Sequence, residues 1–73
     1  MNIDIKAARK ETLAQADTGR RFVVQLDEDA YKKGSESPWH VWDTYGWRVH
    51  ASGLTRPEAQ KAANTAERQH PRR

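Results

Sequence analysis

The sequence predicts a small α+β domain, in which a three-stranded antiparallel β-meander lies between an N-terminal and a C-terminal helix. Residues 38–51 hold all three tryptophans and alternate apolar with polar positions around a glycine, a pattern typical of a β-hairpin. Alanine-rich segments near both ends of the chain repeat with helical spacing and carry cap residues. The expected order is therefore α-β-β-β-α, with the C-terminal helix packed on the sheet.

Size and composition limit the classes of protein that the chain can belong to. Its 73 residues suffice for a single small domain, 1–73, for which self-association would add stability. Cysteine is absent, which excludes disulfides and thiolate metal sites and predicts a reducing compartment. No apolar run approaches the ~20 residues of a membrane span, and no signal peptide is evident, so we expect a cytoplasmic protein without a membrane partner.

The first expected element is a helix that runs from Asp4 to about residue 18. Asp4 is a suitable N-cap, and Gly19 stands where a left-handed residue ends a helix. The residues that repeat near helical spacing are Ile5, Ala8, Thr12, Leu13 and Ala16.

Residues 21–26 form the first expected strand, with Phe22, Val24 and Leu26 on one face and Arg21, Val23 and Gln25 on the other. Residues 27–37 have the composition of a loop and are long for a hairpin connection. Either this segment is a loop throughout, or Asp29–Lys33 forms a single helical turn.

The hairpin register depends on the turn that follows Trp42. A two-residue turn would force Thr44 and Tyr45 to positive φ, which both residues resist, so we expect a three-residue loop with Gly46 left-handed. This register pairs Trp39 with Ala51, His40 with His50, Val41 with Val49 and Trp42 with Arg48. It places on the core face Trp39, Val41, Trp47, Val49 and Ala51. It places on the second face His40, Trp42, Arg48 and His50, a face that is either open or covered by the N-terminal helix.

The C-terminal helix has the clearest local signals in the chain. Thr55 and Glu58 form a capping box, and Pro57 lies in the first turn, where its missing N–H is tolerated. The helix should reach about Gln69, and its buried stripe is expected to be Ala59, Ala62, Ala63 and Ala66. Residues 70–73 form a basic tail that Pro71 keeps out of the helix.

No catalytic constellation is present, so we expect a protein that is not an enzyme and has no cofactor. The sequence contains no cysteine nucleophile and no glycine-rich phosphate loop. His40, His50 and Asp43 are a conceivable set of metal ligands. In the expected register, however, Asp43 falls on the other face, so no metal site is predicted.

The second face of the hairpin carries the binding hypothesis. An aromatic ring such as Trp42, beside His40, Arg48 and His50, can stack on a nucleobase or anchor a protein interface. Arg56 and Lys61 of the C-terminal helix offer phosphate contacts, although a solvated helix face is the default explanation for them. We therefore expect binding to nucleic acid or to a nucleoprotein complex through a basic and aromatic face.

Two resemblances bear on this expectation. The order of elements resembles that of double-stranded-RNA-binding domains, whose Gly-Pro-x-His loop is similar to Ser37-Pro38-Trp39-His40 and whose last helix begins much as 53–63 does. That resemblance implies that His40 approaches a minor groove and that Arg56, Gln60 and Lys61 lie near phosphates. The hairpin followed by Gly-Leu-Thr-x-x-Glu-Ala also resembles small phage and prophage proteins, anti-CRISPR proteins among them. It implies the alternative function, an inhibitor or accessory protein that acts by protein–protein contacts.

Overall fold

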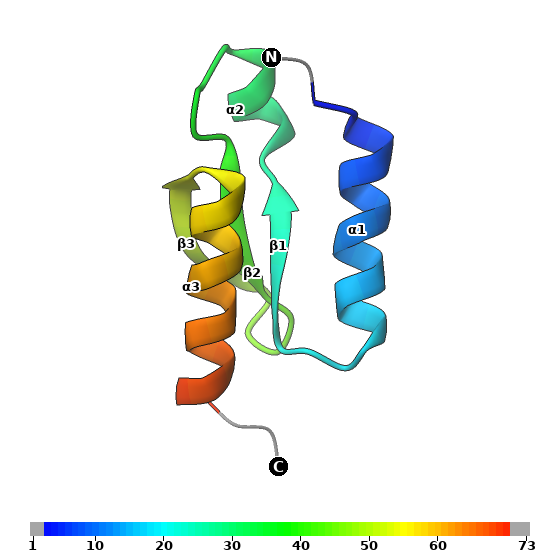
Figure 1. The fold of residues 1–73 in the computed structure, drawn as a ribbon, viewed down its shortest axis with the longest axis vertical. Coiled ribbons are helices and arrows are strands. Elements are labelled where there is room, and N and C mark those ends of the chain that lie inside the picture. The colour runs from blue at the N-terminus through cyan, green and yellow to red at the C-terminus, as the bar shows by residue number, and fades with distance from the viewer. Residues whose placement is uncertain (1–2, 71–73) are drawn as a thin grey trace.

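The computed structural model describes residues 3–70 and has the predicted α+β class (Figure 1). The three strands form one antiparallel sheet in the order β1-β2-β3, and α3 packs on one of its faces. Among residues 3–70, no helix combines the length and the hydrophobicity that a membrane span requires. The elements in chain order are α1 (Ile5–Asp17), β1 (Phe22–Leu26), α2 (Glu28–Lys32), β2 (Trp39–Asp43), β3 (Arg48–Leu54) and α3 (Arg56–Gln69).

The predicted caps define both long helices. The Asp4 carboxylate accepts a hydrogen bond from the Ala7 N–H at 3.1 Å, and Gly19 follows α1 with a φ of 83°. At α3 the Thr55 hydroxyl accepts from the Glu58 N–H, while the Glu58 carboxylate accepts from the Thr55 N–H. The boundaries of these helices are therefore set by local hydrogen bonds that the sequence already indicates.

The segment between β1 and β2 corrects one expectation. Residues 27–37 are not a loop throughout, because Asp27 caps the short helix α2 by accepting from the Ala30 N–H at 3.1 Å. The alternative of one helical turn is right, although the turn begins one residue earlier than Asp29. At the other end, the predicted basic tail starts at the C-cap residue His70, and its residues 71–73 lie outside the described part of the chain.

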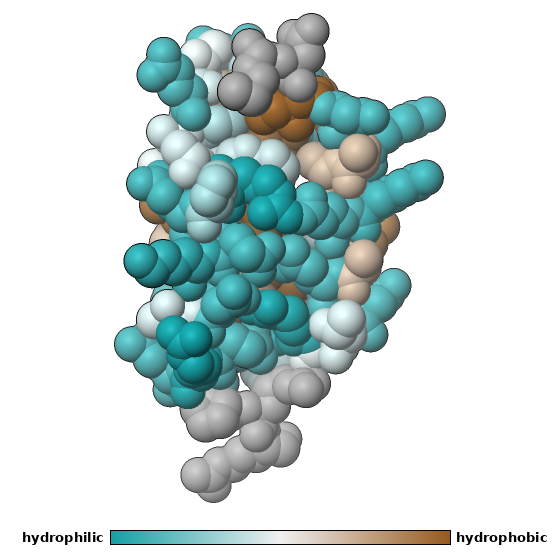
Figure 2. Space-filling view, viewed as in Figure 1, coloured by the Kyte–Doolittle hydropathy of each residue, from teal (hydrophilic) through white to brown (hydrophobic). Residues whose placement is uncertain are grey.

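The core lies between α3 and the sheet. Ala59, Ala63 and Ala66 are buried as predicted, whereas Ala62 is half-buried at the border. The three buried alanines pack with strand residues and with Trp39, the one tryptophan in the core cluster. Small side chains let the α3 backbone approach the strands closely, which leaves room for larger rings. Figure 2 shows the helical side of the molecule as mostly hydrophilic, so the apolar face of α3 is turned inward.

Both long helices close the free edge of β1. Val24 lies on this edge, where its N–H donates to Gln15 Oε1 at 3.1 Å and its carbonyl accepts from the Thr12 hydroxyl at 2.7 Å. The Phe22 N–H donates to a Glu67 carboxylate oxygen at 2.9 Å. The side chains of α1 and α3 therefore satisfy backbone groups that would otherwise invite another strand.

The predicted hairpin register is wrong. The loop has four residues, 44–47, and its positive φ is the 53° of Trp47 and not that of Gly46. Two register shifts follow in β3, each of which inserts one extra residue opposite β2. One added residue moves every later side chain of a strand to the opposite face of the sheet. Residues that were predicted to share one face of the hairpin therefore lie on both faces. The observed pairs are Trp39–Leu54, Val41–Ala51, Trp42–Val49 and Asp43–Arg48.

Several hairpin side chains consequently change faces. Trp47, expected in the core, is 79% exposed, and Val49 shares a face with Trp42. His50 is the extra residue between two paired positions, and its ring lies 4.8 Å from that of the core residue Phe22. His40 and His50 therefore do not face each other.

One face of the sheet has no helix across it within the described residues. We call it the open face, and α3 covers the opposite side while α1 runs alongside β1 (Figure 1). Leu13 of α1, expected on the packed side of its helix, is 63% exposed. The paired strand positions on the open face are Val23, Gln25, His40, Trp42 and Val49, of which Val23 is buried and Val49 is exposed.

Candidate binding site at the hairpin tip

The turn between β2 and β3 is built around the carboxylate of Asp43. This side chain is buried, and its Oδ1 atom accepts from the Tyr45 N–H at 3.0 Å and from the Gly46 N–H at 3.1 Å. Arg21, the residue that precedes β1, donates hydrogen bonds from Nε to Oδ1 at 3.0 Å and from Nη2 to Oδ2 at 3.1 Å. A bidentate ion pair and two backbone hydrogen bonds thus fix the turn in one conformation.

These contacts keep Asp43 ionised. The hydrogen bonds from Arg21 hold the pKa of the Asp43 carboxyl far below its usual range, although burial acts in the opposite direction. The N–H groups of Gly46 and Tyr45 lower this pKa further. In return, the hydrogen bond to Asp43 raises the pKa of Arg21. The pair therefore stays charged at physiological pH.

Gly46 is required by close approach and not by its φ angle. A Cβ atom at this position would lie 2.9 Å from Asp43 Oδ2 and 3.4 Å from Arg48 Nε. The left-handed conformation falls instead on Trp47, a bulky residue for which such a φ is a true outlier.

Aromatic rings project from this turn. Trp47 and Tyr45 are 79% and 55% exposed, and Trp47 contacts Trp42 edge to face with ring centroids 6.2 Å apart. The Arg21 guanidinium carbon lies 5.2 Å from the centre of the Tyr45 ring. Arg48 begins β3 beside them and is exposed. We call this group, Arg21, Trp42, Tyr45, Trp47 and Arg48, the hairpin tip.

The seven residues predicted to bind a partner do not form one surface. His40 and Trp42 belong to the open face. Arg48 and His50 stand on β3, where Arg48 is paired with Asp43 and His50 turns toward Phe22. The remaining three lie on α3, which covers the other side of the sheet: Arg56, Gln60 and Lys61.

His40 is held within the open face. Its Nε2 atom lies 2.5 Å from Oε1 of Gln25, and burial lowers its pKa, a shift that the charge of Asp27 opposes in part. His40 is consequently neutral near pH 7. A neutral imidazole bonded to its own chain makes a poor phosphate ligand.

The predicted residues on α3 are divided between internal contacts and solvent. Arg56 forms an ion pair with Glu11 of α1 and lies 5.9 Å from the ring centre of Trp39. Gln60 accepts a hydrogen bond from Gln15 at 3.0 Å. Lys61 alone of the three is exposed. Arg56 and Gln60 therefore join the two long helices.

Three further arginines, Arg9, Arg20 and Arg21, are paired with carboxylates of the same chain. In residues 3–70, neither Arg48 nor Lys61 has a carboxylate partner. The remaining ion pairs are Arg9–Glu28 at 2.6 Å, Arg20–Glu67 at 3.9 Å and Arg21–Asp43 at 3.0 Å.

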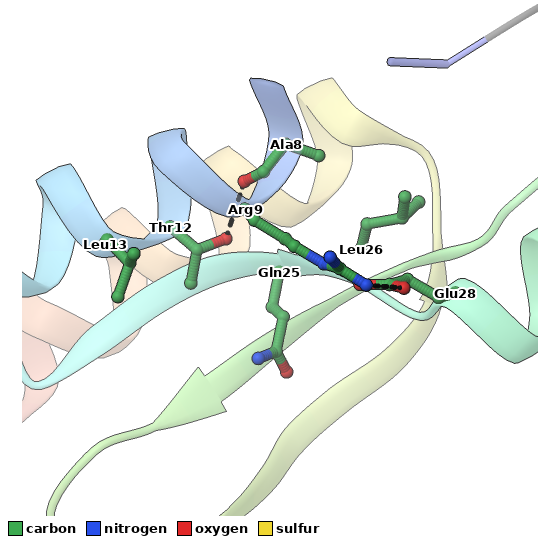
Figure 3. Close-up of a pocket in the computed structure, with 7 residues that line it drawn as sticks. All are labelled: Ala8, Arg9, Thr12, Leu13, Gln25, Leu26 and Glu28. Atoms are coloured by element: carbon green, nitrogen blue, oxygen red, sulfur yellow. Dashed lines mark hydrogen bonds and ion pairs between the residues drawn. The ribbon is translucent and has the colours of Figure 1, made fainter. Parts of the chain in front are cut away.

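A hollow of about 290 Å³ lies between α1 and β1, next to the open face (Figure 3). Its lining combines the apolar side chains of Ala8, Leu13 and Leu26 with Gln25, Thr12 and the Arg9–Glu28 ion pair, and Thr12 donates its hydroxyl hydrogen to the Ala8 carbonyl. The described residues contain no group of three or more His, Asp or Glu side chains placed to hold a metal ion. The polar side chains of this lining already bond within the chain, as Gln25 does to His40, and do not converge on a common point as those of an active site would.

Sequence reasoning singled out Trp42 and Arg48 but missed Tyr45, Trp47 and Arg21. Tyr45 and Trp47 flank a glycine in the turn. This position was the signal available in the sequence, because side chains at a hairpin turn tend to be exposed. The part played by Arg21 had no local signal, because its partner Asp43 is 22 positions away. The chain matches no protein-family model, no curated protein and no solved structure.

Proposed function

We propose that this chain is a non-enzymatic protein of the cytoplasm that binds a partner protein through its hairpin tip. The observation that carries the proposal is Trp47, which combines a left-handed backbone with a ring that is 79% exposed. Glycine would adopt this φ without strain. Strained, exposed residues gather at binding sites, where the surrounding structure holds them in place.

Folding alone gives little reason for a tryptophan at this position. The left-handed conformation costs about 1–2 kcal/mol for a residue with a side chain. The edge-to-face contact with Trp42 returns about 0.5–1.5 kcal/mol. The two contributions nearly cancel, while most of the ring remains in solvent and available to a partner.

The composition and rigidity of the tip support a protein partner. Tryptophan, tyrosine and arginine are the residue types that dominate the binding energy of protein interfaces, and all three occur here. The Asp43 contacts hold the tip before binding, which reduces the entropy lost on association. A small protein that offers one rigid aromatic hairpin suits an inhibitory or accessory role, the role that the sequence likeness to small phage proteins implies.

The distribution of charge favours protein over nucleic acid. Four arginines face carboxylates of the same chain, and Arg56 and Lys61 lie on a different side of the sheet from Trp42. A nucleic-acid site would need several free cations along one track. At the tip, Arg48 has no carboxylate partner among residues 3–70, whereas Arg21 is paired with Asp43.

The test compares Trp47→Gly with a control, Lys61→Ala, which removes an exposed cation from α3. Tagged proteins are used to capture partners from a lysate of the source cell after nuclease treatment. We expect the wild type and Lys61→Ala to retain one stoichiometric protein, and Trp47→Gly to lose it. Circular dichroism and urea unfolding should show that Trp47→Gly keeps its fold, with stability within about 1 kcal/mol of the wild type.

Direct titration with labelled DNA and RNA, single- and double-stranded, tests the alternative that the chain binds nucleic acid. Binding that weakens steeply with salt, and that Lys61→Ala impairs more than Trp47→Gly, would assign the chain to nucleic acid instead. Retention of the captured protein by Trp47→Gly would equally overturn the proposed role of the tip.

A further inference from the structure

A second hollow, of about 850 Å³, lies between α2 and the start of α3, at the end of the molecule opposite the hairpin tip (Figure 1). It shares no lining residue with the hairpin tip. Two aromatic rings, two prolines and two charged side chains contribute to its lining: Tyr31, Trp39, Pro38, Pro57, Glu36 and Arg56.

Trp39 brings a free hydrogen-bond donor to this hollow. Its side chain is only 7% exposed, yet its indole N–H has no acceptor among residues 3–70. Within those residues, the one side-chain polar atom that is both fully buried and unpartnered is Nη2 of Arg20, so the indole nitrogen reaches the surface. Trp39 meets the surface in the hollow. Because a tryptophan this deeply buried usually bonds its N–H, the donor is available to a ligand.

Tyr31 adds a second donor to the same hollow. Its hydroxyl oxygen accepts a hydrogen bond from the Ile3 N–H at 2.8 Å, while its own hydrogen has no acceptor in the described part of the chain. Pro38 is held in place because its carbonyl accepts from the Asp27 N–H at 2.7 Å. The hollow therefore presents donors among apolar rings that are fixed before a ligand arrives.

The charges of the lining favour a cation over an anion. Arg56 is already paired with Glu11, whereas Glu36 has no cation partner among residues 3–70. Glu36 is also exposed. A ligand with a positive charge is attracted to this carboxylate, and an acidic ligand is repelled by it.

We propose that this hollow binds an extended, proline-rich segment of a partner protein that carries a lysine or arginine beside its prolines. A polyproline II segment has no internal hydrogen bonds, so its carbonyls are free to accept from the Trp39 N–H and the Tyr31 hydroxyl. Its proline rings pack on aromatic surfaces, and it loses little entropy because it is already extended. A hollow of about 850 Å³ is on the order of 9 Å across, the length of one turn of such a segment at ~3.1 Å per residue.

The test is a titration of the ¹⁵N-labelled full chain with synthetic peptides, followed by heteronuclear NMR. The probes are oligoprolines of about ten residues that end in arginine or in glutamate, and a glycine-serine peptide of equal length that ends in arginine. The three tryptophans give separate indole N–H signals, so the wild type itself distinguishes this hollow from the hairpin tip. We expect the arginine-ended oligoproline to move the signal of Trp39 and to leave those of Trp42 and Trp47 in place.

Variants then locate the contacts. Trp39→Phe removes the indole N–H and should weaken binding about three- to tenfold. Glu36→Gln removes an exposed charge and should weaken the arginine-ended peptide alone, by about two- to fivefold. Asp17→Asn removes the same charge at the other end of α1 and should change nothing. Pro57→Ala trims an exposed wall of the hollow, and it should weaken every oligoproline even if Trp39→Phe does not fold.

Three results would overturn the site. These are a Trp39 signal that stays unmoved at millimolar peptide, a glycine-serine peptide that binds as tightly as the oligoproline, and tighter binding of the glutamate-ended peptide, which would make the hollow a site for an acidic ligand at Arg56. Movement of the Trp47 signal alone would place the peptide at the hairpin tip and would equally contradict the proposal. Partner capture that Trp47→Gly loses bears only on the hairpin tip, so the two proposals fail independently.

Discussion

Asp43 does more for the hairpin than any other single residue. One oxygen of its carboxylate shapes the turn through two backbone N–H groups, and both oxygens bind Arg21. The first role needs an acceptor at Oδ1, and the second needs a negative charge. An Asp43→Asn variant separates the two, because the amide keeps the acceptor and loses the charge.

The depressed pKa of Asp43 predicts the pH dependence of stability. A carboxyl whose pKa is lowered by folding stabilises the native state above its unfolded pKa of about 3.9, and this contribution is lost as the pH falls through the folded value. The free energy of unfolding of the wild type should therefore fall more steeply below about pH 4 than that of Asp43→Asn. Urea unfolding at a series of pH values measures both. Parallel acid dependence of the two proteins would contradict the prediction.

At the scale of elements, the two edges of the sheet are protected in different ways. The edge of β1 is closed by side chains from α1 and α3, whereas β3 carries two register shifts that interrupt a regular ladder. Gln15 is central to the protection of the β1 edge, since it accepts a hydrogen bond from the Val24 N–H and donates one to Gln60. It thus joins an edge strand and both long helices.

Gln15→Met should destabilise the protein by about 1–3 kcal/mol, because it leaves the Val24 N–H without its partner. Gln69→Met makes the same change at an exposed position of α3, where we expect an effect within about 0.5 kcal/mol. The measurement is urea unfolding followed by circular dichroism. Equal stabilities of the two variants would show that the edge contact contributes nothing.

At the scale of the whole molecule, the distance between α3 and the sheet depends on the buried alanines. Ala63 is fully buried in the core cluster together with Val41 and Trp39. A larger side chain there must either push α3 away or force neighbouring side chains from their rotamers. The core therefore tolerates little change in the distance between α3 and the sheet.

Ala63→Leu should cost about 1–3 kcal/mol, and it should expose Trp39 to the quencher acrylamide. The matched control is Ala14→Leu on the exposed side of α1, where the change in stability should stay within about 0.5 kcal/mol. Thermal unfolding and tryptophan quenching measure the two effects. A fully stable Ala63→Leu protein would mean that the layers have spare room.

Local chemistry allowed much of this structure to be predicted. The caps Asp4 and Thr55, the end of α3 at Gln69 and the alanine stripe all follow from residues within a few positions of one another. Helix boundaries and buried stripes are set by near neighbours, so the sequence alone determined them. The burial of Trp39 was predicted for the same reason, since it alternates with Val41 along one strand.

The hairpin tip was decided by the tertiary structure. The turn depends on the contact between Asp43 and Arg21, which is 22 positions away, and no local pattern indicates it. That contact leaves Gly46 no room for a side chain and places the left-handed residue at Trp47. A turn one residue longer than expected and the register shifts of β3 then moved Val49 to the open face and His50 to the other side. The sequence determined which segments pair, and long-range packing decided which side chains reach the surface.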